Sequence, residues 1–355
     1  MAAPENPQSA PRRAARRRVG LAIGAILSAG LLAFALSRLN LSRMGHALIT
    51  AKPGWVALAF VLMGSSLVLR SGSWYQTLRA ALPDSTIARM PVVRATMIGV
   101  MASAVFPGRV GEPSRVLVLA RRIEGPNRTL VPILAGTVFS QTLVNLLALA
   151  ILAAVTFTSV PLLAGHASGI VAAIAVPLLI CALVLLGPRL LALARRSRSA
   201  RLVRAANAIG SGLRLARVGL TVFARPRLGA AAVVFQLGAW ALQWLACYMV
   251  VLSLGLQNHA TLVSAAAILL AVNVSAILPA TPSNVGVFQA ACLVVLAAYG
   301  VGAGPGLAYG IILQAVEILT ALALGIPALL GENLTWGDIR AGGRAGGESA
   351  GDGAQ

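Results

Sequence analysis

The sequence predicts an all-α, polytopic integral membrane protein with about seven to eight transmembrane helices and one or two re-entrant hairpins. Hydrophobic residues make up 58% of the 355 positions and charged residues only 11%, less than half of their usual share in soluble domains. The mean hydropathy is +0.85, and the apolar residues are gathered in long runs. The net charge of +20 comes from basic residues that flank these runs, an arrangement typical of membrane proteins.

The apolar runs follow a polar N-terminal arm and precede a polar tail. Residues 1–18 form a basic arm, and residues 331–355 form a Gly-rich tail that we expect to be disordered. Residues 19–37 are the first apolar run, and their length favours an uncleaved helix over a cleaved secretory signal. The remaining runs, which complete a single transmembrane domain over residues 19–330, are 54–70, 91–107, 129–157, 168–187, 229–254, 261–279, 284–300 and 305–330.

The distribution of arginine in the loops predicts the orientation of the chain. The connector 189–227 contains ten Arg and no acid, the N-terminal arm is basic, and 108–128 carries five Arg. Because basic loops remain cytoplasmic, we expect the N-terminus and these loops on the cytoplasmic side of the plasma membrane. The loops 158–167 and 255–260 lack Arg and Lys, so we expect them outside.

The weaker run 91–107 is expected to re-enter the membrane rather than cross it. The flanking segments 71–90 and 108–128 are both predicted to be cytoplasmic, so the run must return to the side from which it came. Re-entrant backbone is tolerated only where protein or a water-filled cavity surrounds it. The run therefore predicts an internal polar site.

A second break interrupts the apolar sequence in the C-terminal half. Segment 278–286, LPATPSNVG, contains two prolines, a glycine and small polar residues, and it shares a Pro-then-Val-Gly pattern with 106–111, FPGRVG. Corresponding breaks in two halves are typical of transporters built from an inverted repeat. Two alternatives remain open, an inverted repeat or a chance similarity. In the first, 261–279 re-enters from the outer face and the tail is expected to end outside.

The segment 106–115, FPGRVGEPSR, predicts an anion site. A helix that begins near Glu112 would direct free N–H groups and the positive end of its dipole toward the re-entrant tip. Arg109 and Arg115 would add planar guanidinium groups, which bind phosphate with two parallel hydrogen bonds. Glu112 lies three residues before Arg115 and is placed to pair with it on one helix. The alternative is that both arginines only contact lipid headgroups.

Few groups in the apolar body can support catalysis or bind a metal. Its only acids are Asp84, Glu112, Glu124 and Glu317, and the histidines and cysteines show no zinc or disulfide spacing. We therefore expect no metal, no cofactor and no enzyme, although an enzyme that uses Glu112 as its acid or base is a further alternative. Aromatic residues are 5% of the chain and the basic clusters flank apolar runs, which argues against a nucleic-acid partner.

Amide side chains also occur within the apolar runs. Hydrogen bonding between helices explains such residues by default, and a polar path for a lipid headgroup is the alternative. The amides concerned are Gln141, Asn145, Gln236, Gln243 and Asn273.

Segment 106–115 resembles the P-x-R-x-G-E-x-x-R signature of a flippase-like family, the lysylphosphatidylglycerol synthase transmembrane region. The run LPATPSNVGVFQAA at 278–291 resembles the second signature of this family, and Arg70, Trp74 and Leu78 resemble an upstream element. The resemblance covers about residues 20–330. It implies a multi-spanning protein that translocates charged or glycosylated lipids. The sequence ends soon after residue 330, where the bifunctional synthases continue into an aminoacyl-transfer domain, so lysyl transfer is not expected.

The two signatures provide the candidate binding residues, with some departures from the family pattern. Asn284 and Val285 replace glycines, Gln289 replaces an acid, and Glu317 stands where many relatives have Arg. We expect Glu317 to partner Arg94 or Arg115 and to be the candidate coupling group, or else to form a packing hydrogen bond with Gln314 or Asn273. The candidate substrate-binding residues are Arg94, Arg109, Gly111, Glu112, Arg115, Pro279, Pro282, Asn284 and Gly286.

These patterns together predict a lipid flippase or flippase-like transporter. The expected substrate is an anionic phospholipid or a polyprenyl-phosphate-linked lipid whose phosphate binds the arginines of the re-entrant motif. The alternative is a membrane scaffold or accessory subunit of a lipid-linked glycosyl or aminoacyl transfer system, with a glycosyltransferase or lipid-synthesis partner. Arginine greatly outnumbers lysine, since Lys52 is the single lysine, and this bias is typical of GC-rich bacterial genes.

Overall fold

The computed structural model describes residues 51–83, 85–105, 110–123, 127–159, 221–276 and 284–332. Within these ranges every regular element is a helix, which confirms the predicted all-α fold. Several sequence-based expectations lie outside the described residues, namely those for 1–18, 19–37, 168–187, most of 189–227, 333–355, Arg109, Pro279 and Pro282.

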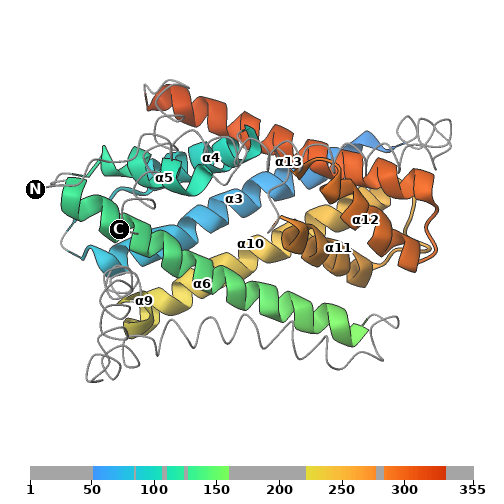
Figure 1. The fold of residues 1–355 in the computed structure, drawn as a ribbon, viewed down its shortest axis with the longest axis horizontal. Coiled ribbons are helices and arrows are strands. Elements are labelled where there is room, and N and C mark those ends of the chain that lie inside the picture. Colours follow the sequence, from blue (N-terminus) through green and yellow to red (C-terminus); the bar gives the residue numbers. More distant parts are fainter. Residues whose placement is uncertain are drawn as a thin grey trace, which may run out of the picture.

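Long helices form the frame of the molecule (Figure 1). Four helices in the described part of the chain are long and apolar enough to cross a membrane, as expected for a multi-pass membrane protein. They are α3 (Pro53–Ala81), α6 (Asn127–Ser159), α10 (Pro226–Ser253) and α13 (Ala303–Gly331), and the short α9 (Thr221–Ala224) precedes α10.

Shorter helices pack as two hairpins between the long ones. The first hairpin pairs α4 (Arg89–Val105) with α5 (Gly111–Ala120), and the second pairs α11 (Leu262–Ser275) with α12 (Val287–Ala298). The hairpins occupy opposite ends of the view in Figure 1, with α4 and α5 on the left and α11 and α12 on the right. With 10 to 17 residues each, these helices are shorter than the roughly 20 residues that a full crossing requires.

The two halves of the described chain repeat the same order of elements in opposite directions. The series α3, α4, α5, α6 and the series α10, α11, α12, α13 both read long, short, short, long, and corresponding helices begin 173 to 176 residues apart. Helices α3 and α10 run antiparallel, because the N–H of Lys52 donates to the carbonyl of Ser253 at 2.8 Å while Ser73 Oγ donates to the carbonyl of Ala232 at 2.9 Å. Of the two alternatives, the structure therefore favours the inverted repeat.

Helix α3 extends well beyond the predicted end at residue 70. It continues to Ala81, and residues in this added part, including Ser73, Trp74 and Thr77, are buried against other helices. The hydroxyl of Thr77 donates to the carbonyl of Trp74 at 2.7 Å, so this polar group is satisfied within the helix. As a result, Arg70 lies in the middle of a membrane helix instead of at its edge.

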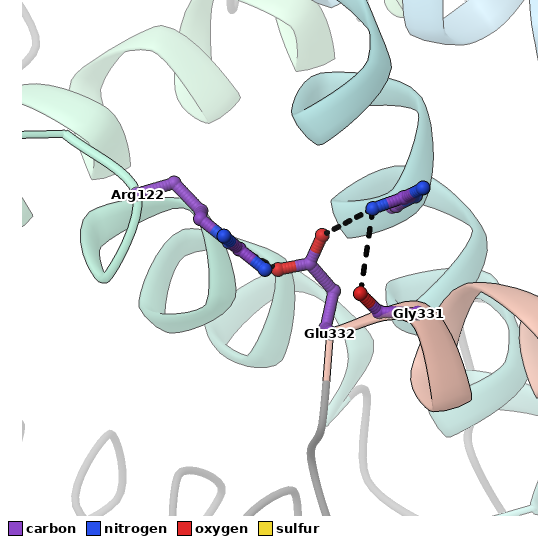
Figure 2. Close-up of polar contacts among 4 residues, drawn as sticks. Arg122, Gly331 and Glu332 are labelled. Carbon is purple, nitrogen blue, oxygen red and sulfur yellow. Dashed lines mark hydrogen bonds and ion pairs between the residues drawn. The ribbon is translucent and has the colours of Figure 1, made fainter.

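An ionic cluster fastens the end of α13 to the first hairpin (Figure 2). Glu332, whose side chain is 4% exposed, accepts hydrogen bonds from Arg122 at 2.6 Å and from Arg94 at 3.4 Å. Arg94 lies in the second turn of α4, and Arg122 lies just after the end of α5. The cluster therefore joins both helices of the hairpin to the end of α13. The structure thus places residue 332 at the same end of the bundle as the predicted loop 108–128. Helix α13 therefore runs back toward that end. Residues 333–355 lie outside the described part of the chain, and the side of the membrane on which the tail ends stays a prediction.

The two helices of the first hairpin pack closely only because Gly99 of α4 and Gly111 at the start of α5 face one another. A Cβ atom on Gly111 would lie 2.1 Å from the carbonyl oxygen of Gly99 and 2.1 Å from Ser103 Oγ. We predict that Gly111→Ala separates the two helices and lowers the thermal unfolding midpoint in detergent by several degrees, as expected for an overpacking cost of about 1–3 kcal/mol. Gly54→Ala is the control, since nothing lies within 4 Å of its added Cβ. Equal midpoints for the two variants would contradict this close approach.

Candidate functional site

A cavity of about 620 Å³ lies between the two hairpins. Its wall includes Ser103 near the end of α4, Glu112 at the start of α5, Ala276 at the end of α11 and Asn284 just before α12. The middle portions of α3, α6, α10 and α13 complete the wall. Both sequence breaks therefore reach the same internal cavity, which is mostly apolar but carries charged and amide groups at selected points.

Arg115 projects from α5 into this cavity. Its Nη1 donates to Gln141 Oε1 at 2.8 Å, and its guanidinium lies 4.8 Å from the centroid of the Trp74 ring. Stacking on an aromatic face fixes the plane of a guanidinium and stabilises its charge. The Trp74 indole is itself held by a 3.0 Å hydrogen bond from Nε1 to Thr137 Oγ1. Arg115 Nε is buried and has no hydrogen-bond partner in the part of the chain that the structure describes.

Arg70 reaches the cavity from α3. Its Nη2 donates to Gln243 Oε1 on α10 at 3.0 Å, and its Nε is buried with no hydrogen-bond partner within the described ranges. Arg70 is close enough to Arg115 for the two positive charges to repel one another. Two guanidinium groups that share a cavity in this way are chemically suited to bind an anion.

Gln141 on α6 connects the two arginines. Its Oε1 accepts from Arg115 Nη1, and its Nε2 donates to the backbone carbonyl of Arg70 at 2.8 Å. One amide thus orients the Arg115 side chain relative to α3 and uses both of its polar atoms to do so.

Two carboxyl groups offset the arginine charge in the described part of the cavity wall. Glu112 is exposed at the start of α5 and interacts electrostatically with Arg115. Glu317 lies near the middle of α13, where Arg70 is the opposite charge that acts on it. Although these four residues all lie within the described ranges, the structure shows no direct ion pair between Glu112 and Arg115 or between Glu317 and Arg70.

The second hairpin contributes neutral amides where the first contributes arginine. Asn284 has φ of 54° and Gly286 has φ of 91°, so the chain turns sharply through left-handed backbone before α12. The N–H of Gly286 donates to Gln289 Oε1 at 2.6 Å, and Gln289 Nε2 donates to Gln314 Oε1 on α13. The Oδ1 atom of Asn284 is buried and has no hydrogen-bond partner among the described residues.

A further amide pair lies on the walls formed by α6 and α10. Asn145 Oδ1 accepts from Gln236 Nε2 at 2.7 Å and from Trp240 Nε1 at 2.9 Å. The Oε1 atom of Gln236 is buried without a partner. The default explanation of these amides, interhelical hydrogen bonding, is therefore observed, and the same residues also line the cavity.

The structure brings most of the described site residues together. Those that line the cavity are Gly111, Glu112, Arg115, Asn284 and the coupling candidate Glu317. Gly286 sits beside the cavity as the residue that caps α12. Arg94 is not among the lining residues, because it binds Glu332 and the carbonyl of Gly331 in the ionic cluster.

Arg70 is the principal cavity residue that the sequence did not assign to the site. The apolar run 54–70 places Arg70 at the end of a span, and only the resemblance to the family includes it in a motif. The internal repeat could have pointed to Arg70, because Arg70 and Gln243 occupy corresponding positions of the two halves. They are 173 residues apart, which equals the offset between α3 and α10, and they are hydrogen-bonded to each other.

We predict that Gln141→Met destabilises the protein, because it removes an acceptor from the buried Arg115 and a donor from the Arg70 carbonyl. Leaving a buried charged group without its partner costs about 1–3 kcal/mol or more, so the thermal unfolding midpoint in detergent should fall clearly. Gln257→Met, in an exposed loop, is the matched control and should leave it unchanged. A midpoint unaffected by Gln141→Met would show that this bridge is absent.

Comparison with known proteins identifies the family. No curated protein matches the chain. The family model described as the lysylphosphatidylglycerol synthase TM region matches residues 20–325, which include all of the helices around the cavity except the last turns of α13. The chain therefore belongs to the family of the lysylphosphatidylglycerol synthase TM region.

Proposed function

We propose that this protein is a lipid flippase or flippase-like transporter that moves a phosphate-containing or glycosylated lipid across the plasma membrane. One observation carries the proposal. The guanidinium groups of Arg70 and Arg115 face one internal cavity. Each donates one hydrogen bond to a side-chain amide within the described residues, which leaves most of its five N–H donors for a ligand. The membrane setting makes a lipid headgroup the natural source of the missing acceptor.

The chemistry of the two arginines suits a phosphate. A guanidinium offers five N–H donors in a rigid plane and stays charged inside a protein, so two of them can enclose the oxygens of a phosphodiester. The cavity volume of about 620 Å³ falls within the usual range for ligand pockets, about 300–1,000 Å³. This is enough space for a headgroup, while the acyl or prenyl chains remain in the surrounding lipid.

The amide groups suit the uncharged part of such a headgroup. Gln236 Oε1 and Asn284 Oδ1 are buried acceptors that have no hydrogen-bond partner among the described residues, and both residues line the cavity. Small side-chain rotations would direct these acceptors toward the hydroxyl groups of a glycerol or a sugar. Arginine on one side and amides on the other therefore support a polar lipid with one phosphate and neighbouring hydroxyl groups.

The inverted repeat supports a transport role. We infer that both hairpins are re-entrant, since the described ends of their helices border the cavity and lipid cannot satisfy freed backbone groups. Repeats of opposite orientation allow the two halves to exchange conformations around a fixed central site, which exposes the site to each side in turn. With the N-terminus in the cytoplasm, the first hairpin enters from the cytoplasmic side and the second from the outside.

We predict that Arg115→Ala strongly slows lipid translocation in reconstituted vesicles. The assay follows fluorescent phosphatidylglycerol as it moves between leaflets. Loss of a charge-assisted contact worth about 1.5–3 kcal/mol should lower the rate at limiting lipid by roughly ten- to a hundredfold.

The matched control is Arg227→Ala, an exposed arginine near the start of α10 that does not line the cavity. It should translocate the lipid like the wild type. Equal rates for the wild type and Arg115→Ala with several phosphate-containing lipids would rule out this cavity as the transport site.

A further inference from the structure

We propose that the cavity binds its anionic headgroup together with one proton, which Glu317 accepts as the anion engages Arg70. This inference rests on the proposed phosphate site and deepens it. It makes the transporter proton-coupled, with the anion and the proton entering on the same half-cycle.

The position of Glu317 is the first observation. It lies near the middle of α13 and lines the same cavity as Arg70. Arg70 is the positive group whose charge stabilises the Glu317 carboxylate. Among the described residues no ion pair joins the two side chains, and the observed side-chain hydrogen bond of Arg70 goes to Gln243. Arg70 can therefore turn toward an incoming anion without first breaking a tight ion pair to Glu317.

The charge balance of the cavity is the second observation. Its described wall carries two positive groups, Arg70 and Arg115, and two negative groups, Glu112 and Glu317. A phosphodiester that binds Arg70 adds one negative charge and takes over the positive charge that compensated Glu317. An isolated carboxylate inside an apolar bundle is strongly unfavourable. Uptake of one proton by Glu317 removes this cost and leaves the total charge of the cavity unchanged.

None of the other described groups around Glu317 is expected to accept a proton near pH 7. From α10, α12 and α13, the titratable groups within electrostatic range are Cys247, Cys292 and Tyr309, which are neutral around pH 7 in their ordinary states, and the Tyr309 hydroxyl donates to the Cys247 carbonyl. The other described lining residues from α4, α6 and α11 are uncharged.

The remaining acid of the wall, Glu112, differs from Glu317 in its surroundings. It is exposed at the start of α5, where water stabilises its charge, and it acts on Arg115 rather than on Arg70. Glu112→Gln is therefore compared with Glu317→Gln by proton uptake alone, because Glu112 lines the binding cavity and its loss can change the affinity. Both substitutions remove one carboxylate from the same cavity, and only the second removes the proposed proton acceptor. Arg227→Ala, which is exposed and does not line the cavity, is the variant expected to bind like the wild type.

The test is calorimetric titration of the purified protein with short-chain phosphatidylglycerol between about pH 6 and pH 8, a range in which a phosphodiester keeps its single charge. Repeating each titration in two buffers of different ionisation enthalpy gives the number of protons taken up per lipid. We expect the proton uptake of the wild type to rise toward one per lipid at the alkaline end of this range, and the uptake to persist in Glu112→Gln. At that end the affinity of the wild type should fall by up to about tenfold for each unit rise in pH. A second set of titrations uses the deacylated headgroup, which is a water-soluble phosphodiester. It shows whether the cavity recognises the phosphate alone or requires the acyl chains of a lipid.

For Glu317→Gln we expect no proton uptake, an affinity that does not change with pH, and tighter binding than the wild type at about pH 8. Two outcomes would overturn the coupling and leave the flippase proposal intact. One is binding by the wild type without proton uptake, and the other is proton uptake that persists in Glu317→Gln. Absence of binding of both probes at every pH would overturn the phosphate site and the coupling together. The wild-type buffer comparison decides the question even if the variant fails to fold.

Discussion

Two arginine side chains must keep their charge inside a bundle that is otherwise mostly apolar, and this requirement shapes the structure around them. Arg115 is held by the face of Trp74 and by Gln141, while Arg70 is held by Gln243. Glu317 supplies opposite charge to Arg70 from a distance. The four long helices and both hairpins each place part of this arrangement around one cavity, so the polar site and the helix packing stabilise one another.

The inverted repeat explains how such a site arises at the centre of the molecule. Corresponding positions of the two halves meet there, as in the hydrogen bond between Arg70 and Gln243, which are 173 residues apart. The halves have diverged in chemistry, since the first hairpin supplies Arg115 and the second supplies the neutral Gln289 and Asn284. A polar lipid headgroup with one charged and one hydroxyl-bearing part matches this difference.

Much of the fold and part of the site followed from sequence alone. Apolar runs predicted the long helices, and the two Pro- and Gly-containing breaks predicted the first hairpin and, if the halves are inverted repeats, the second, because lipid leaves few ways to arrange backbone that is not in a full span. The return leg of the first hairpin, α5, was not predicted, since it lies in a segment that was expected to be a loop. The role of Arg70 did not follow, since a charge usually ends a span, whereas α3 continues to Ala81 by burying small and polar residues. Arg94 illustrates the reverse case, because its partner Glu332 lies far away in sequence and no local pattern pairs them.

The most direct test of this account is an experimental structure of the protein in a bilayer disc that contains phosphatidylglycerol, determined by electron cryomicroscopy at a resolution that shows headgroups. The account predicts a lipid phosphate within hydrogen-bond distance of both the Arg70 and Arg115 guanidinium groups, between the tips of the two hairpins. A cavity closed by side chains, or ordered lipid found only on the outer surface of the bundle, would contradict it.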